Sequence, residues 1–146
     1  MEYKRHPERL ALHFIAGPII YALAIPLVIV DISLEIYHRV CFPLYGMPYV
    51  PRGQYFRFDR AKLPYLTLWE KLNCQYCSYA NGLLLYASVI AGETEQYWCG
   101  IRNKKEPGFV EPRHHDTFLR YGDKKEFTSF LEKKTASGIK KGSRRQ

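Results

Sequence analysis

The pattern of apolar and polar residues divides the chain into an apolar N-terminal segment and a more polar remainder. From Leu10 to Val30 the sequence contains no Asp, Glu, Lys or Arg. A helix needs about 20 apolar residues to cross a bilayer, and this segment has that length. Gly17-Pro18 and Pro26 interrupt it, and proline kinks a helix because it removes a backbone hydrogen bond. We therefore expect an N-terminal membrane helix that is kinked or re-entrant.

Two other interpretations fit the same segment. Basic residues precede it, and Ala22-Leu23-Ala24 resembles the small-residue site of a cleaved signal peptide, although the apolar run continues to Val30. A buried core helix is the second alternative, but a chain of 146 residues offers little protein to surround one. Membrane association is the interpretation that we adopt.

Beyond the apolar segment, the spacing of apolar residues predicts several helices. Ile32, Ile36 and Val40 share one face of a helix over residues 31–40, which would run along the membrane surface and end near Pro43. The other expected elements are a short strand over 55–59 and helices over 63–73, 78–98 and 123–134. Loops with proline and glycine separate them. The predicted fold class is mainly α: a membrane helix followed by a small helical domain with irregular loops.

These elements predict three regions along the chain. Residues 1–41 form a membrane anchor with an interfacial helix, residues 42–134 a small cysteine-containing domain, and residues 135–146 a basic tail. The tail has small and basic residues and few apolar ones, a composition typical of disorder.

The charge of the chain points to an acidic partner surface. The formal net charge is +8, which favours anionic lipid or nucleic acid as a partner. The apolar anchor makes a lipid bilayer the simpler partner, and no nucleic-acid recognition fold is visible in the sequence. Basic residues flank the apolar segment on both sides, and cytoplasmic segments are enriched in such residues. If the segment enters the membrane and returns, both flanks stay in the cytoplasm, and we therefore expect the C-terminal part to lie there. The alternative is a kinked single span with the cysteines outside.

All four cysteines follow the apolar segment, and two of them form the pair Cys74-x-x-Cys77. Two thiols at this spacing can bind one zinc or iron ion together with two further ligands. The candidates for the other metal ligands are Cys41, Cys99, His114 and His115. If residues 78–98 form one continuous helix, a rise of about 1.5 Å per residue separates Cys77 from Cys99 by roughly 33 Å. Cys99 could then share the ion only if the chain turned back at Gly82 or Gly92.

Two other interpretations of the cysteine pair stay open. A redox dithiol is favoured by a helix N-terminus, which stabilises a thiolate, and Cys77 lies just before a predicted helix. No βαβ pattern of a thioredoxin accompanies the pair. The cysteines could instead be buried as small apolar side chains, which is the leading interpretation for Cys41 and Cys99.

The histidines and acidic residues offer a second set of candidates. His114-His115-Asp116 could supply a metal ligand, or a general base oriented by a carboxylate, or form a solvated loop. Glu93 and Glu95 face different directions on a helix, so they do not form a carboxylate pair. The sequence has no glycine-rich phosphate loop, nucleophile elbow or HExxH motif.

Three stretches between Asp31 and Cys99, namely DISLEIYHRVCFPLYG, NCQYCSYANG and EQYWC, resemble a family of small bacterial membrane-associated proteins of unassigned function. The resemblance places the protein at the bacterial inner membrane and implies no mechanism. Separately, Cys74-x-x-Cys77 followed by Ser78 is similar to one metal knuckle of the rubredoxin type. A rubredoxin needs a second such pair, and this chain lacks one, so iron electron transfer does not follow.

These observations together predict a membrane-anchored protein with a structural zinc or iron site. Its expected role is that of an accessory subunit that organises a protein partner at the membrane. The alternative is a membrane-bound thiol-redox or electron-transfer protein that uses Cys74 and Cys77.

Overall fold

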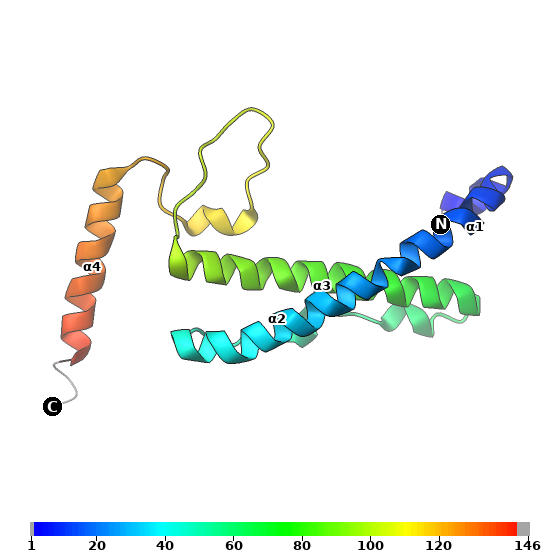
Figure 1. The fold of residues 1–146 in the computed structure, drawn as a ribbon, viewed down its shortest axis with the longest axis horizontal. Helices are drawn as coiled ribbons and strands as arrows, with labels where there is room; N and C mark the ends of the chain where they lie inside the picture. The colour runs from blue at the N-terminus through cyan, green and yellow to red at the C-terminus, as the bar shows by residue number, and fades with distance from the viewer. Residues whose placement is uncertain (1, 143–146) are drawn as a thin grey trace. The chain divides into compact units, whose positions relative to one another are not determined.

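The computed structural model describes residues 2–142, and its secondary structure is mainly α-helical (Figure 1). Its α-helices are α1 (Leu10–Ala22), α2 (Ala24–Tyr45), α3 (Leu68–Trp98) and α4 (Lys124–Gly142). Its 3-10 helices are η1 (Glu2–Arg5), η2 (Pro7–Arg9), η3 (Arg52–Gln54), η4 (Asp59–Lys62) and η5 (Arg113–Thr117). Residues 2–142 contain no strand, only an isolated parallel bridge between Ile101 and Leu119. The predicted mainly α fold with a long apolar helix at its start is confirmed.

The long apolar helix is kinked near Leu23. α1 ends one residue before Leu23 and α2 begins one residue after it. Pro26 has no N–H to donate to the carbonyl of Ala22, so the regular helical hydrogen bonds are interrupted there. Leu23 keeps helical dihedral angles, and α2 continues away from α1 without turning back (Figure 1).

α2 continues four residues beyond Cys41, so the predicted end near Pro43 is wrong. Pro43 falls in the last turn, where the loss of one hydrogen bond does not stop the helix. Gly46 ends it instead, because its φ of +68° is a left-handed conformation that glycine adopts easily. The N–H groups of Gly46 and Met47 then donate to the last carbonyls of the helix.

α3 replaces the two helices predicted over 63–73 and 78–98. Thr67 and Glu70 form a capping box at its start: Glu70 accepts hydrogen bonds from the N–H and hydroxyl of Thr67, and its own N–H donates to the Thr67 hydroxyl. The cysteine-containing stretch after Asn73 has no proline, so the helix continues through it.

The chain forms two compact units, Met1–Ile90 and Ala91–Gln146. In the first unit α2 and α3 run in the same direction, and residues 46–67 return along them (Figure 1). The buried core of this unit is Phe42, Val50, Tyr86 and Ile90. The predicted strand over 55–59 is wrong, because Tyr55 and Phe56 pack on Tyr86 of α3 instead of pairing with another strand.

In the second unit, a loop and η5 connect the end of α3 to α4. Asp123 caps α4 by accepting a hydrogen bond from the N–H of Glu126. α4 extends to Gly142, whereas the composition of residues 135–146 predicts disorder. A helix that has formed extends at little cost per added residue. The rest of the predicted disordered tail, residues 143–146, lies outside the described residues.

Candidate metal centre

The predicted cysteine pair lies in the interior of a helix. Cys74 and Cys77 are one turn apart on α3, well after its first residue, Leu68. They are therefore neither at a helix N-terminus nor in a turn whose amides face the sulfurs. Cys77 is exposed and Cys74 is half-buried, and both are free thiols.

The other two cysteines are also free thiols. Cys41 is half-buried near the end of α2, and Cys99 is exposed directly after α3. α3 has no break at Gly82 or Gly92, so the chain does not turn back between Cys77 and Cys99.

The structure brings the two predicted histidine ligands together with Glu95. Nε2 of His114 lies 2.9 Å from Oε2 of Glu95, and Nε2 of His115 lies 3.3 Å from Oε1 of the same carboxylate. One ligand atom of each residue lies within 4.8 Å of the other two. Within the described part of the chain, this is the only such group of three or more His, Cys, Asp or Glu side chains.

A short loop after α3 positions these side chains. Gly100 adopts a φ of +61° at the end of the helix, where its N–H donates to the carbonyl of Glu95. The N–H of Arg102 donates to Leu119 O, and the guanidinium donates to the carbonyls of Asp116 and Phe118. The two ends of the loop that carries η5 are thereby held together.

Close packing fixes the rings of His114 and His115. A Cβ atom at Gly92 would lie 2.8 Å from Cγ of His114, so the His114 ring approaches α3 closely only because residue 92 is glycine. His115 is 1% exposed and stacks on Phe118, with 4.8 Å between ring centroids.

The second nitrogen of His115 faces another carboxylate. Nδ1 of His115 lies 3.9 Å from Oε1 of Glu111, and neither atom has a hydrogen-bond partner among the residues that the structure describes. A neutral imidazole has one N–H and one lone pair. Either tautomer of a neutral His115 therefore points a lone pair at a carboxylate, Glu95 or Glu111. Either a metal cation at Nε2 with the proton on Nδ1, or an N–H on both nitrogens, removes both conflicts.

The histidines also affect the acidity of Glu95. The hydrogen bond with His114 lowers the pKa of the Glu95 carboxyl below its usual 4.5, and His115 adds to this effect. Partial burial of the carboxyl acts in the opposite direction but is the weaker influence. Glu95 is therefore held as a carboxylate, the form that binds metal ions.

The sequence identified part of this group. His114 and His115 were candidate ligands, but Asp116, the expected orienting carboxylate, is exposed and contributes only its backbone carbonyl to Arg102. Glu95 supplies the carboxylate instead. The local sequence gives no sign of this role, because the partners of Glu95 lie 19 and 20 residues later.

A second polar group, missed from the sequence, lies between α2 and α3. Arg52 of η3 forms two hydrogen bonds with Asp31, which also accepts one from the hydroxyl of Tyr79. Burial and this bond raise the pKa of Tyr79 to about 12. The guanidinium of Arg52 lies 4.6 Å from the ring centroid of Phe56.

The same face of α2 carries a fully buried histidine. The N–H of Val50 donates to Nε2 of His38, so the proton of a neutral His38 is on Nδ1. Nδ1 then donates to the hydroxyl of Tyr86, which donates to Glu35. Asp31, Glu35 and His38 recur at intervals of four and three residues, the spacing of one helix face. The interval was visible in the sequence, but the partners on other elements were not.

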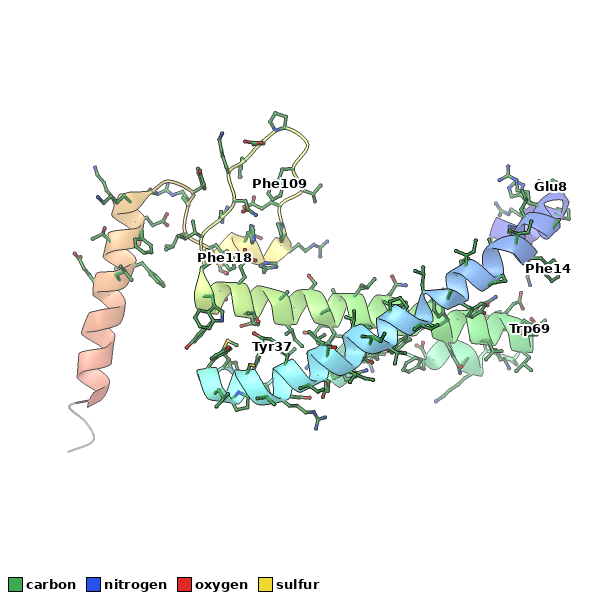
Figure 2. The ribbon with its side chains drawn as sticks, in the orientation of Figure 1. Glu8, Phe14, Tyr37, Trp69, Phe109 and Phe118 are labelled. Atoms are coloured by element: carbon green, nitrogen blue, oxygen red, sulfur yellow. The ribbon has the colours of Figure 1, made fainter. Side chains whose placement is uncertain are left out.

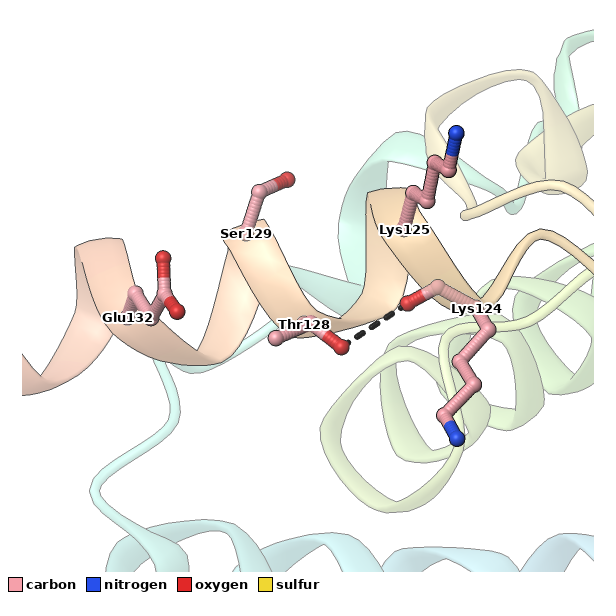
Figure 3. Close-up of a pocket in the computed structure, with 5 residues that line it drawn as sticks. All are labelled: Lys124, Lys125, Thr128, Ser129 and Glu132. Atoms are coloured by element: carbon pink, nitrogen blue, oxygen red, sulfur yellow. Dashed lines mark hydrogen bonds between the residues drawn. The ribbon is translucent and has the colours of Figure 1, made fainter.

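A shallow hollow lies on α4 and is lined by that helix alone (Figure 3). The residues that line it are Lys124, Lys125, Thr128, Ser129 and Glu132. The hydroxyl of Thr128 donates to the carbonyl of Lys124, as is common on exposed helices. None of the predicted site residues lies there.

Comparison with known proteins gives no match: no family model, no curated protein and no solved structure is similar to this chain. One described helix, Ala11–Tyr45, is long and apolar enough to cross a membrane, and its most apolar stretch is not buried. By length and composition, a signal sequence also meets this criterion.

Proposed function

We propose that the protein is a membrane-associated accessory protein with a structural metal ion, zinc or iron, bound by Glu95, His114 and His115. The observation that carries the proposal is the convergence of two imidazole nitrogens on one carboxylate. Two histidines and one carboxylate are a ligand set that zinc accepts, and a structural ion would need a fourth ligand to close the site. The same set also holds iron(II).

The proposed ion would hold η5 against the end of α3. His114 and His115 belong to η5, and Glu95 belongs to the last turns of α3. Metal-bound histidines usually donate their other N–H to a carboxylate. Oε1 of Glu111 is the carboxylate oxygen near Nδ1 of His115, and it would have to move closer than its present 3.9 Å to receive that bond.

Membrane association is the second part of the proposal. The exposed apolar helix Ala11–Tyr45 supports it, together with the basic residues on both sides of the segment. We place the C-terminal part in the cytoplasm at the bacterial inner membrane, where it would organise a protein partner. The alternative, thiol redox chemistry at Cys74 and Cys77, has less support because the pair lies in the interior of a helix.

The test is metal analysis of the full-length protein purified from membranes. We expect about one zinc or iron ion per chain, lost in His114→Ala and Glu95→Ala. The matched control is the double variant Cys74→Ser/Cys77→Ser, which should keep the ion. Circular dichroism of each variant checks that its helices still form.

The opposite pattern would contradict the assignment. If the cysteine variant loses the ion and the histidine variant keeps it, the ion belongs to the cysteine pair. Metal-free protein with a readily reduced disulfide would favour the thiol-redox alternative. Recovery of uncleaved protein in the soluble fraction without detergent would reject membrane association.

A further inference from the structure

The N-terminal flank of the apolar helix contacts the beginning of α3. Lys4 of η1 forms an ion pair with Glu70, whose side chain is 5% exposed. Glu70 is fixed in place because it is also the capping residue of α3. The basic residue that precedes the apolar segment is therefore tied to the polar start of another helix.

The C-terminal flank contacts the same helix about two and a half turns further on. Asp31, the first charged residue after the apolar run, accepts a hydrogen bond from Tyr79 of α3. Glu70 and Tyr79 are nine residues apart, which is about 14 Å along a helix axis. The hydrocarbon core of a bilayer is about 30 Å thick. The points where the two flanks contact α3 are therefore closer together than the hydrocarbon core is thick, which favours an arrangement with both flanks on one side of the membrane.

Charged and polar groups also lie beside the apolar helix between these two points. Tyr76 donates to the carbonyl of Ile20, so the end of α1 lies against α3. The guanidinium of Arg60, on the return segment, donates to Ser78 of α3. Ser78 adjoins Tyr79, so this charged group lies close to the Asp31 contact at the C-terminal flank of the apolar run.

The outer face of the apolar helix is free for lipid within the first unit. Five residues at helical spacing on α2 are each more than half exposed: Ile25, Ile29, Ile32, Ile36 and Val40. On α1, Phe14 is 74% exposed and points outward (Figure 2). The opposite face of α2 carries the buried polar group with Asp31 and His38. An apolar stripe opposite a polar face is the pattern of a helix in a membrane interface.

We propose that α1 and α2 enter one leaflet of an anionic bilayer and do not cross it, so that both flanks stay on the same side. The inference rests on the proposed membrane association and adds its geometry. The first 90 residues contain nine Lys or Arg against six Asp or Glu, an excess that complements anionic headgroups. Bilayer lipids would cover the exposed apolar stripe of α2.

The experiment places one reporter cysteine on each side of the apolar segment. In the full-length protein, Glu8→Cys is introduced with Cys41, Cys74, Cys77 and Cys99 changed to serine. A second variant keeps only the exposed native Cys77. A membrane-impermeant maleimide is applied to intact cells and to inside-out membrane vesicles. Both reporters should react in the inside-out vesicles, and neither in intact cells.

Labelling of the two reporters from opposite sides would overturn the one-leaflet geometry while leaving membrane association intact. Recovery of both variants in the soluble fraction would instead reject the membrane association itself. If Glu8→Cys disturbs the fold, Arg9→Cys at the neighbouring exposed position serves as a second reporter. A second copy covering the stripe would give a soluble oligomer, which also contradicts the proposal.

Discussion

Nδ1 of His115 and Oε1 of Glu111 lie 3.9 Å apart, and both atoms are buried. If His115 binds the proposed ion through Nε2, its Nδ1 carries the proton and would donate it to Glu111 once the two atoms approach to hydrogen-bond distance. Loss of such an outer partner typically weakens metal binding 10- to 100-fold. We expect Glu111→Ala to weaken binding by about this factor and Glu111→Gln, which can still accept the bond, by less.

Competition with a chelator of known affinity measures this effect. Glu106→Ala is the matched control, because Glu106 is an exposed acidic residue of the same loop. Equal affinities for Glu111→Ala and the control would show that Glu111 has no role at the ion.

Alanine substitutions at two glycines of α3 are expected to affect different properties, metal binding at Gly92 and stability at Gly82. Alanine at Gly92 would press on the ring of His114, so Gly92→Ala should weaken metal binding. Alanine at Gly82 would lie 2.7 Å from the carbonyl oxygen of Tyr55, so Gly82→Ala should destabilise the fold by about 1–3 kcal/mol. That cost exceeds the gain of about 1 kcal/mol in helix propensity.

Metal affinity and thermal unfolding distinguish the two glycine variants. Gly82→Ala should keep the metal affinity of the parent protein. Gly17→Ala is the control, since no atom lies within 4 Å of the added Cβ. A Gly92→Ala protein with unchanged affinity would argue against His114 as a ligand.

Tyr86→Phe should destabilise the first unit. The hydroxyl of Tyr86 links Nδ1 of His38 to the carboxylate of Glu35. Without it, a buried N–H of His38 loses its acceptor, which costs about 1–3 kcal/mol. Denaturant unfolding in mild detergent measures the change, with Tyr65→Phe, at a 74% exposed position, as the control. Equal stabilities of the two variants would contradict this role.

The raised pKa of Tyr79 predicts that the folded protein loses stability at alkaline pH. Its pKa is about 12 in the folded protein and about 10 in an unfolded chain. Between these values the unfolded state binds fewer protons, so stability falls as the pH rises. Below pH 10 the contribution is fully present. The free energy of unfolding should fall more between about pH 10 and about pH 12, the interval between the two pKa values, in the parent protein than in Tyr79→Phe. Equal losses would show that Tyr79 ionises normally.

The helices were the part of the fold that the sequence predicted best. Apolar spacing located α2, α4 and most of α3, because one buried face leaves a periodic pattern. The boundaries were less predictable. The capping pair Thr67 and Glu70 marks the start of α3, and Gly46 marks the end of α2. Pro43 is a weaker sign of a helix end than these contacts, because a proline in the last turn removes only one hydrogen bond.

The site was predicted only as far as residue types allow. His114 and His115 are unusual enough to attract attention, whereas Glu95 is one of fourteen acidic residues. Glu95 becomes the partner of the histidines only because the turn at Gly100 and the hydrogen bonds of Arg102 bring η5 back to α3. These are contacts between segments distant in sequence, and no local pattern encodes them.

Two of the polar contacts between α2 and α3 prevent these helices from sliding past each other. Asp31 and Tyr79 are 48 residues apart in the sequence, and so are His38 and Tyr86. A slip of one residue would separate both pairs at once, because the donors and acceptors are at fixed heights along each axis. Apolar contacts alone would tolerate such sliding. Within the first unit, α2 and the part of α3 beside it therefore move as one rigid body. Any force that tilts α2 also tilts that part of α3.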